Sequence, residues 1–132
     1  MTRSGNDAKL VERYLGSLEA RVMRILWASP GLTVRDVASR LPRVRRRAYT
    51  TVMTVMNRLH EKGLLSRKLA DRAYVYRPRL SESEFLQDLT QKRVQSLIAE
   101  FGDVAVANFV GEIRQLGPEE FEKLRRLVED SL

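Results

Sequence analysis

The sequence predicts a mainly α-helical protein with an N-terminal winged helix-turn-helix, made of three helices and a β-hairpin wing, and a C-terminal helical region. Three segments with apolar residues at helical spacing come first. They are followed by LLSRKLADRAYVYRP, in which apolar and polar residues alternate as they do in strands. The rest of the 132-residue chain returns to helical spacing. We therefore expect a winged-helix domain over residues 1–80, whose residues 1–14 form a polar tail, and a helical dimerisation region over residues 81–132.

The first two predicted helices lie on either side of a proline-glycine break. LGSLEARVMRILW carries an apolar face, and Ser17 can cap its N-terminus. TVRDVASRL offers Thr33 as its cap and Asp36 three residues later, which is the spacing of a capping box. Each segment is thus expected to form a short helix with a defined start.

The third predicted helix begins near Arg46 to Ala48 and ends at Gly63, and its two faces differ in chemistry. A helix turns by about 100° per residue, so its apolar residues gather on one side: Ala48, Val52, Val55, Met56 and Leu59. The opposite side and its flanks carry hydroxyl, amide and guanidinium groups, from Arg47, Thr50, Thr51, Thr54, Asn57 and Arg58. Threonine is a mediocre helix former, so its repetition indicates a role for the exposed face.

The alternating segment predicts two strands, at about residues 64–69 and 73–77, with a turn at or near Ala70-Asp71-Arg72. Aromatic side chains occur in this hairpin and in the first predicted helix. We expect Trp27, Tyr74 and Tyr76 to lie in the core, because they sit in apolar-rich segments.

Three further helices are predicted after the hairpin. Ser81 and Glu84 have capping-box spacing, Asp103 can cap DVAVANFVGEIRQL, and Pro118 suits the first turn of the last helix. Their apolar stripes are too extensive for short helices attached to a small winged helix, and a symmetric partner subunit is the obvious place to bury them. The expected dimerisation residues are Phe85, Leu89, Leu97, Phe101, Phe109, Leu124 and Leu127.

The charge of the chain is divided unequally between its two parts. Residues 1–80 contain 18 Lys and Arg against 6 Asp and Glu, a net charge of +12. Residues 81–132 contain 6 basic and 11 acidic residues, a net charge of −5. A basic part joined to an acidic part indicates that the first meets a polyanion, whereas the alternative is a protein with solvated charged faces.

An exposed face of short hydroxyls and arginines is suited to the major groove of DNA. Threonine can bond to a base edge or a phosphate and touch a thymine methyl, while arginine can bind guanine with two hydrogen bonds. The basic residues before this helix and in the hairpin are suited to phosphate: Arg43, Arg45, Arg46, Arg47, Arg67, Lys68 and Arg72. The alternative is an exposed face without a partner, which explains tolerated threonines but not their clustering between RVRRR and a basic hairpin.

Several other classes of protein are disfavoured by composition. Without cysteine there is no disulfide framework, thiol nucleophile or thiolate metal site, and one histidine, His60, cannot build a histidine-rich site. With no phosphate-binding glycine loop either, we expect no enzyme activity, no metal and no cofactor. No apolar run approaches the roughly 20 residues of a membrane span, and MTRSGNDAKLVERY lacks the apolar stretch of a signal peptide. We expect a cytoplasmic protein that does not enter membranes.

Four segments, LGSLEARVMRILW, TVRDVASRL, AYTTVMTVMNRLHEKGLLSRK and DRAYVYRP, resemble the BlaI/MecI/CopY family of transcriptional repressors in order and spacing. The resemblance runs from about Leu15 to the C-terminus. It implies a homodimer that binds inverted-repeat operators, commonly with TACA/TGTA half-sites, and represses nearby promoters. By position, it implies DNA contacts at Tyr49, Thr50, Thr51, Thr54 and Arg58, with Arg67, Lys68 and Arg72 in the wing.

The resemblance also bears on regulation. Copper-responsive members carry a cysteine pair near the C-terminus, which this chain lacks. Beta-lactam-responsive members are cleaved at an Asn-Phe bond in the dimerisation region, and Asn108-Phe109 stands in the matching place, which would make a regulatory protease a partner. The alternative is that Phe109 is only a core residue of the dimer interface. A second class of function is an architectural DNA binder or protein-interaction module without operator specificity.

Overall fold

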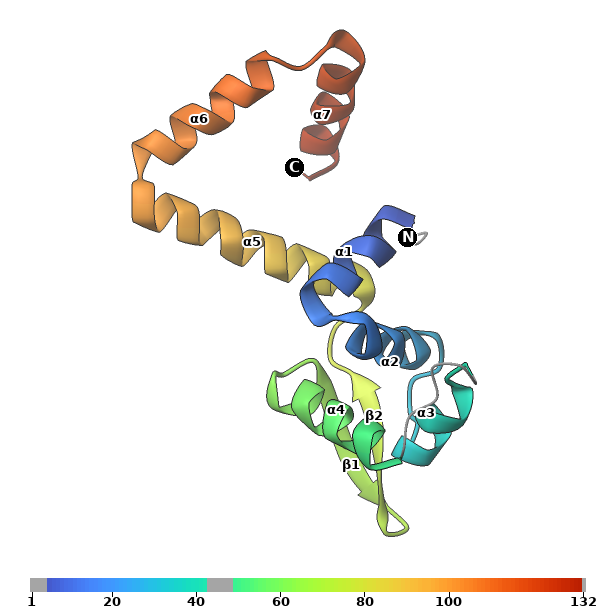
Figure 1. Cartoon of the computed structure of the whole chain (residues 1–132). Helices are drawn as coiled ribbons and strands as arrows, with labels where there is room; N and C mark the ends of the chain where they lie inside the picture. Colours follow the sequence, from blue (N-terminus) through green and yellow to red (C-terminus); the bar gives the residue numbers. More distant parts are fainter. Residues whose placement is uncertain (1–4, 43–48, 132) are drawn as a thin grey trace. The chain divides into compact units, whose positions relative to one another are not determined.

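The computed structural model describes residues 5–42 and 49–131. Their elements are α1 (Gly5–Leu15), α2 (Ser17–Ala28), α3 (Val34–Arg40), α4 (Tyr49–Glu61), β1 (Leu65–Ala70), β2 (Ala73–Pro78), α5 (Glu82–Phe101), α6 (Asp103–Arg114) and α7 (Pro118–Ser131) (Figure 1). The mainly helical fold with one antiparallel hairpin after the first helices is confirmed. The chain divides into two compact units between Leu89 and Thr90, so α5 belongs to both. None of the helices in the described ranges has the length and apolar character that crossing a membrane requires.

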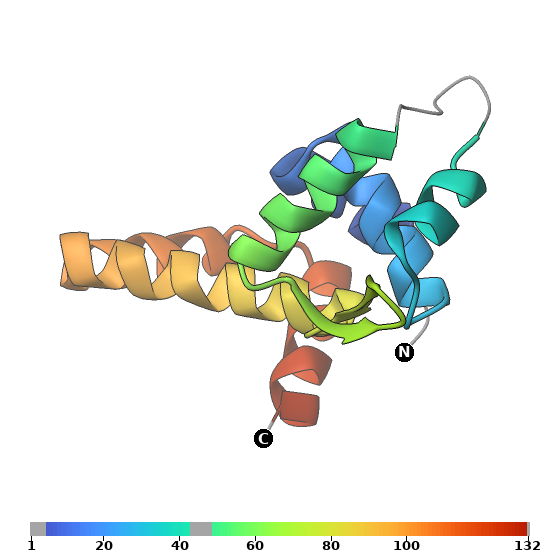
Figure 2. The same ribbon diagram turned by 90° about the horizontal axis from the view of Figure 1, so that it is seen from below.

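Helix α2 is the centre of the first unit, where it contacts α1, α3, α4 and β2 (Figures 1 and 2). Apolar residues recur along α2, α3 and α4 at helical spacing, and their side chains meet in one core. This core consists of Val22, Met23, Leu26, Leu32, Val34, Val37, Leu41, Val52, Val55, Met56, Leu59, Leu65 and Tyr76. Burying one Leu or Met side chain contributes about 1.5–3 kcal/mol, so this shared core holds the three helices and the hairpin together.

Residues 5–15 form a helix where the sequence predicts a polar tail. Val11 is fully buried beside Ala20 and Phe85, and the Arg24 guanidinium donates a hydrogen bond of 2.9 Å to the carbonyl of Ala8. The segment is polar overall, but its few apolar residues share one helical face that packs on α2. The expectation of a tail is corrected here because a small apolar face is enough when neighbouring helices cover it.

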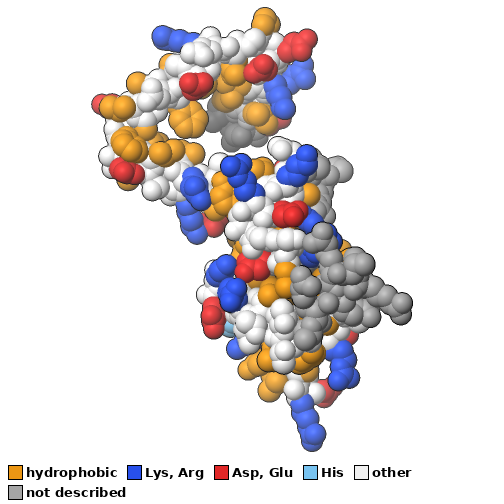
Figure 3. Space-filling model, in the orientation of Figure 1, with side chains coloured by type: hydrophobic (Ala, Val, Ile, Leu, Met, Phe, Trp, Pro, Cys, Tyr) orange, Lys and Arg blue, Asp and Glu red, His pale blue; other side chains and the backbone are white. Residues whose placement is uncertain are grey.

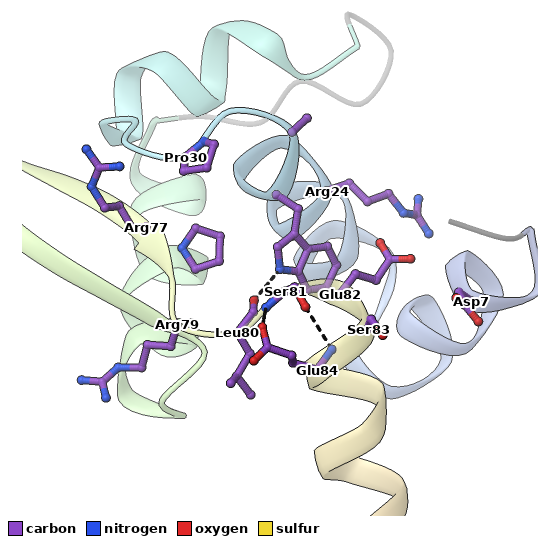
Figure 4. Close-up of a pocket in the computed structure, with 13 residues that line it drawn as sticks. Asp7, Arg24, Pro30, Arg77, Arg79, Leu80, Ser81, Glu82, Ser83 and Glu84 are labelled. Atoms are coloured by element: carbon purple, nitrogen blue, oxygen red, sulfur yellow. Dashed lines mark hydrogen bonds between the residues drawn. The ribbon is translucent and has the colours of Figure 1, made fainter. Parts of the chain in front are cut away.

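The predicted capping boxes of α3 and α5 are both confirmed. The amide of Asp36 donates to Thr33 Oγ1 at 3.2 Å, and the amide of Thr33 donates to Asp36 Oδ2 at 3.1 Å. The hydrogen bond from the Thr33 backbone lowers the pKa of the Asp36 carboxyl below its usual value. The same reciprocal pair joins Ser81 and Glu84, each bond 3.1 Å long (Figure 4).

Two other predicted caps are incorrect. Ser17 and Asp103 are the first residues inside α2 and α6, and the preceding glycines occupy the N-cap positions. Gly16 has φ of 89° and Gly102 has φ of 60°, a region that glycine enters without the clash of a Cβ. The entry of the chain into both helices therefore depends on glycine geometry rather than on a side-chain cap.

Strands β1 and β2 form an antiparallel hairpin closed by a two-residue turn. The register runs from Leu65 opposite Pro78 to Ala70 opposite Ala73, within one residue of the predicted strands. Asp71 and Arg72 fill the turn with φ of 48° and 71°, the positive pair that a type I′ turn requires.

Backbone hydrogen bonds attach the hairpin to the helices. The amide of Tyr76 donates to the carbonyl of Leu32 at 2.8 Å, and the amide of Leu32 donates to the carbonyl of Tyr76 at 3.2 Å. The wing is thereby anchored to the segment between α2 and α3.

The start of α5 packs within the first unit. Trp27 Nε1 donates to the carbonyl of Leu80 at 2.8 Å, and the Trp27 and Phe85 rings lie 6.2 Å apart. The sequence assigns Phe85 to a dimer interface, whereas the structure leaves only 8% of it exposed and packs Leu89 partly against the same cluster. The assignment of Phe85 is corrected because Trp27, distant in sequence, already covers its ring.

The second unit contains the end of α5 together with α6 and α7. Among its described residues, none is buried. Ten of its large apolar side chains are exposed, and Figure 3 shows hydrophobic atoms at the surface of these helices. They are Leu97, Ile98, Phe101, Val104, Val106, Phe109, Val110, Phe121, Leu127 and Val128.

Candidate nucleic-acid interface

Helix α4 separates a buried side from an exposed side, as its sequence predicts. Val52, Val55, Met56 and Leu59 are buried in the core. The expected DNA contacts on this helix are all exposed: Tyr49, Thr50, Thr51, Thr54 and Arg58. The expected phosphate contacts Arg43, Arg45, Arg46 and Arg47, and the expected buried residue Ala48, lie outside the described residues.

The hydroxyl of Thr54 is engaged within its own helix. Its Oγ1 donates a hydrogen bond of 2.9 Å to the carbonyl of Thr50, one turn earlier. Because that donor is occupied, Thr54 presents an acceptor oxygen and a methyl group to its surroundings. Both suit a base edge better than a phosphate, which needs a donor.

Arg58 sits at the far end of the same exposed side, near an acidic partner. Its Nη1 lies 3.7 Å from Glu19 Oε1, and Lys62 Nζ lies 3.4 Å from Glu19 Oε2. The Glu19 side chain is 12% exposed, while that of Arg58 is 57% exposed. An exposed ion pair contributes about 0–1 kcal/mol, so Arg58 can exchange Glu19 for a nucleic-acid group at little cost.

The wing presents different side chains on its two faces, because successive residues of a strand point to opposite sides. Arg67 pairs with Tyr76 across the hairpin, whereas Lys68 pairs with Val75 on the other face. The guanidinium of Arg67 lies 4.2 Å from the centre of the Tyr74 ring. Tyr76 is buried as expected, but the placement of Tyr74 in the core is corrected, since 43% of it is exposed.

A hydrogen-bond network that sequence reasoning missed joins the wing to α4. Arg67 Nη1 donates to Asn57 Oδ1 at 2.8 Å and to the Tyr76 hydroxyl at 3.4 Å. The Tyr76 hydroxyl in turn donates to Asn57 Oδ1 at 3.2 Å. The hydrogen bond with Tyr76 raises the pKa of the Arg67 guanidinium above its usual value. The alternation of the strands and the pairing of the hairpin could have predicted part of this network, because they place Arg67 and Tyr76 on one face.

Three elements of the first unit line one hollow of about 480 Å³. Its residues come from the start of α3, from α4 and from the hairpin: Thr33, Val34, Arg35, Tyr49, Met53, Asn57, Arg72, Ala73, Tyr74 and Tyr76. Lys68 and Arg72 are exposed toward the hairpin tip, where Figure 3 shows basic side chains. The structure thus brings Tyr49, Met53 and Asn57 of α4 together with Arg72 at the end of the wing around one concave surface.

Comparisons with known proteins find relatives of this chain among repressors. A family model described as penicillinase repressor matches residues 15–130. The transcriptional regulator BlaI of Mycobacterium tuberculosis is 37% identical over 113 residues, covering 85% of this chain and 80% of the relative. The penicillinase repressor of Bacillus licheniformis is 25% identical over 116 residues, covering 88% of this chain and 90% of the relative. A solved DNA-binding domain of the repressor BlaI has 29% identity and a TM-score of 0.45, covering 50% of this chain and 80% of that domain.

Arg72 occupies a position that favours glycine, and its replacement should separate stability from DNA binding. Arg72→Gly should raise the free energy of unfolding by about 1 kcal/mol, because φ of 71° strains a residue with a Cβ. It should also weaken binding to duplex DNA and reduce the slope of log affinity against log salt by about 0.9 for each bound subunit, the loss of one phosphate contact per subunit. Urea denaturation and salt titrations of binding measure the two effects.

Asp71→Gly is the matched control, since it relieves the same kind of strain at φ of 48° and keeps the cation. It should gain stability without a smaller salt slope. An unchanged slope in Arg72→Gly would show that Arg72 makes no phosphate contact.

Proposed function

The chain belongs to the penicillinase repressor family of DNA-binding transcriptional repressors, and we propose that it acts as a homodimer on inverted-repeat operators with TACA/TGTA-type half-sites. The observation that carries this proposal is that α4 exposes its threonines, while Tyr49, Met53 and Asn57 of the same helix share one hollow with Arg72 of the wing. The working repressor consists of two copies of the chain bound to DNA. It needs no small-molecule cofactor. It acts in the cytoplasm, where its operator is accessible.

In the proposed complex α4 enters the major groove, which is wide enough for a helix. Tyr49, Thr50, Thr51 and Thr54 face the base edges, and the Thr54 methyl group contacts a thymine methyl of the half-site. Arg58 leaves Glu19 for the nucleic acid at the end of the helix. Phosphates beside the groove are bound by Arg46, Arg47, Lys68 and Arg72.

The proposal of a homodimer is supported by the second unit. It exposes ten large apolar side chains and buries none among its described residues, which is far from what a monomer in water presents. A second copy offers the same surface, and a two-fold axis lets both copies cover each other. The interface residues we propose are Leu97, Phe101, Phe109, Leu124 and Leu127, with Leu89 at its margin.

We also propose that Asn108-Phe109 is where a regulatory protease inactivates the repressor. The bond lies inside α6, which contains no buried residue and has Gly111 within it. Glycine disfavours a helix interior by about 1 kcal/mol against alanine, so this segment can open locally more readily than a packed helix. Cleavage there would separate α7 from the rest of the interface.

Substitutions at Thr54 test the direct reading of the operator. Thr54→Ala should lower affinity for the operator about fourfold per half-site, because one methyl group buried against thymine is worth ~0.8 kcal/mol. Affinity for an operator whose contacted thymine is replaced should stay the same. Thr54→Val, which keeps the methyl group, is the control and should retain discrimination. Arg46→Ala should weaken binding to both duplexes alike.

Fluorescence anisotropy with the two duplexes at fixed salt gives these affinities. If Thr54→Ala changes neither affinity nor discrimination, α4 does not face the groove as proposed. Equal binding of the intact protein to operator and random duplex would instead identify an architectural DNA binder.

Removing the second unit should leave a monomer. A chain ending at Leu89 keeps the first unit and its buried Phe85, so it should stay folded and bind one half-site. Its affinity for the full operator should fall by roughly 10²–10⁴, because the two DNA-binding units are no longer linked. Phe101→Glu in the full chain should have the same effect without truncation. Sedimentation of a stable dimer of residues 1–89 would place the interface in the first unit instead.

Cleavage can be followed by the mass of the protein in its native cells under cell-wall stress. We expect derepression to coincide with a fragment that ends at Asn108. A chain carrying Asn108→Ala, which leaves the proposed interface residue Phe109 in place, should stay intact and keep repressing. Derepression while the chain keeps all 132 residues would eliminate the cleavage switch and point to a different signal.

A further inference from the structure

Arg67 is a wing cation whose guanidinium faces α4, where it bonds to Asn57. It lies on the same face of β1 as the buried Leu65, directly opposite Tyr76 on β2. Lys68, its neighbour in sequence, lies on the other face and is exposed. Arg67 and Lys68 are adjacent in sequence but lie on opposite faces of the wing, so we expect them to have different roles.

The contacts of Arg67 hold it between the wing and α4. Its guanidinium donates to Asn57 Oδ1 at 2.8 Å and lies over the Tyr74 ring at 4.2 Å. The Tyr76 hydroxyl donates to the same oxygen of Asn57 at 3.2 Å. Because a guanidinium can only donate, the Asn57 oxygen must be the atom that faces the wing.

Among the described residues, this network is the outermost set of side-chain hydrogen bonds between the wing and α4. Nearer the base, the hairpin is held by the burial of Leu65 and by the backbone pairing of Leu32 with Tyr76. Beyond Arg67 every residue from 68 to 72 is exposed. The direction in which the tip extends from α4 is therefore set at Arg67 and Asn57.

We propose that Arg67 is a positioning residue that fixes the wing against α4 through Asn57 and Tyr76, so that Lys68 and Arg72 reach the DNA backbone while the α4 threonines face the bases. This inference rests on the proposed function. Holding the wing in its bound direction before DNA arrives removes part of the ordering cost of binding. Arg67 then strengthens binding without itself contacting phosphate.

Charge and geometry separate this role from that of a phosphate ligand. A phosphate ligand can be replaced by lysine, which keeps the charge, and its removal lowers the salt slope. A positioning arginine cannot be replaced by lysine, because lysine lacks the planar fork that reaches Asn57 and lies over Tyr74. Its removal lowers affinity at every salt concentration without changing the slope.

The experiment is a double-mutant cycle on the full-length protein, with affinity for a TACA/TGTA inverted-repeat duplex measured across a salt series. The variants are Arg67→Lys, Arg67→Met, Asn57→Leu and the Asn57→Leu/Arg67→Met pair. Lys68→Met is the matched control from the other face of the same strand. Each Arg67 or Asn57 variant should bind about tenfold more weakly, within the range of coupled neighbours. The pair should bind no more weakly than either single variant.

The salt slope should stay at the wild-type value in the Arg67 variants and fall by about 1.8 in Lys68→Met, since one phosphate contact is lost in each of the two subunits. The proposal is overturned if Arg67→Lys binds like the wild type while Arg67→Met loses about 1.8 of slope. Additive losses in the double variant would also overturn it, since Arg67 and Asn57 would then act separately.

Hydrogen exchange of the wing without DNA gives a second measurement that does not depend on the operator. Amides of residues 66–72 should exchange faster in Arg67→Lys and Asn57→Leu than in the wild type. In Lys68→Met their exchange rates should equal those of the wild type. Unchanged exchange in the first two variants would refute the attachment even if Arg67→Met fails to fold. Failure of the wild-type protein to prefer the operator would count against the proposed function alone, because the exchange comparison remains decisive for Arg67.

Discussion

A two-stranded hairpin is marginally stable in water, and this hairpin is held to its helices through Tyr76. The backbone of Tyr76 pairs with Leu32, its ring is 1% exposed in the core, and its hydroxyl bonds to Asn57 on α4. One residue thus joins the wing to the segment before α3 and to α4. The proposed placement of α4 in the major groove, with the wing on the DNA backbone, depends on that attachment.

The two units meet the requirement for burial in opposite ways. The first unit buries aliphatic and aromatic side chains around α2, and α1 and the start of α5 add a second cluster around Val11 and Phe85. The second unit leaves most of its large apolar side chains exposed, although they recur at helical spacing. The partner subunit proposed above would cover such a surface. Two linked DNA-binding units recognise an inverted repeat far better than one.

Several residues of the candidate interface are less stable choices than the fold alone would favour. Arg72 keeps a Cβ at φ of 71°, and threonine recurs in a helix where alanine would be better. Arg58 is held by a weak exposed pair with Glu19 rather than by a buried one. These residues are all exposed, on α4 or at the tip of the wing, and departures of this kind are typical of a surface selected for binding.

Periodicity and local hydrogen bonding were enough to predict much of this protein from sequence. The capping boxes at Thr33 and Ser81, the hairpin and the two sides of α4 depend on residues within a few positions of one another. Tertiary structure decided whether α1 finds a partner surface, that Trp27 covers Phe85, and that Arg67 turns toward Asn57 while Lys68 faces outward. Those outcomes depend on side chains brought together from distant parts of the chain, and the free energy of each contact exists only once the core has placed them side by side.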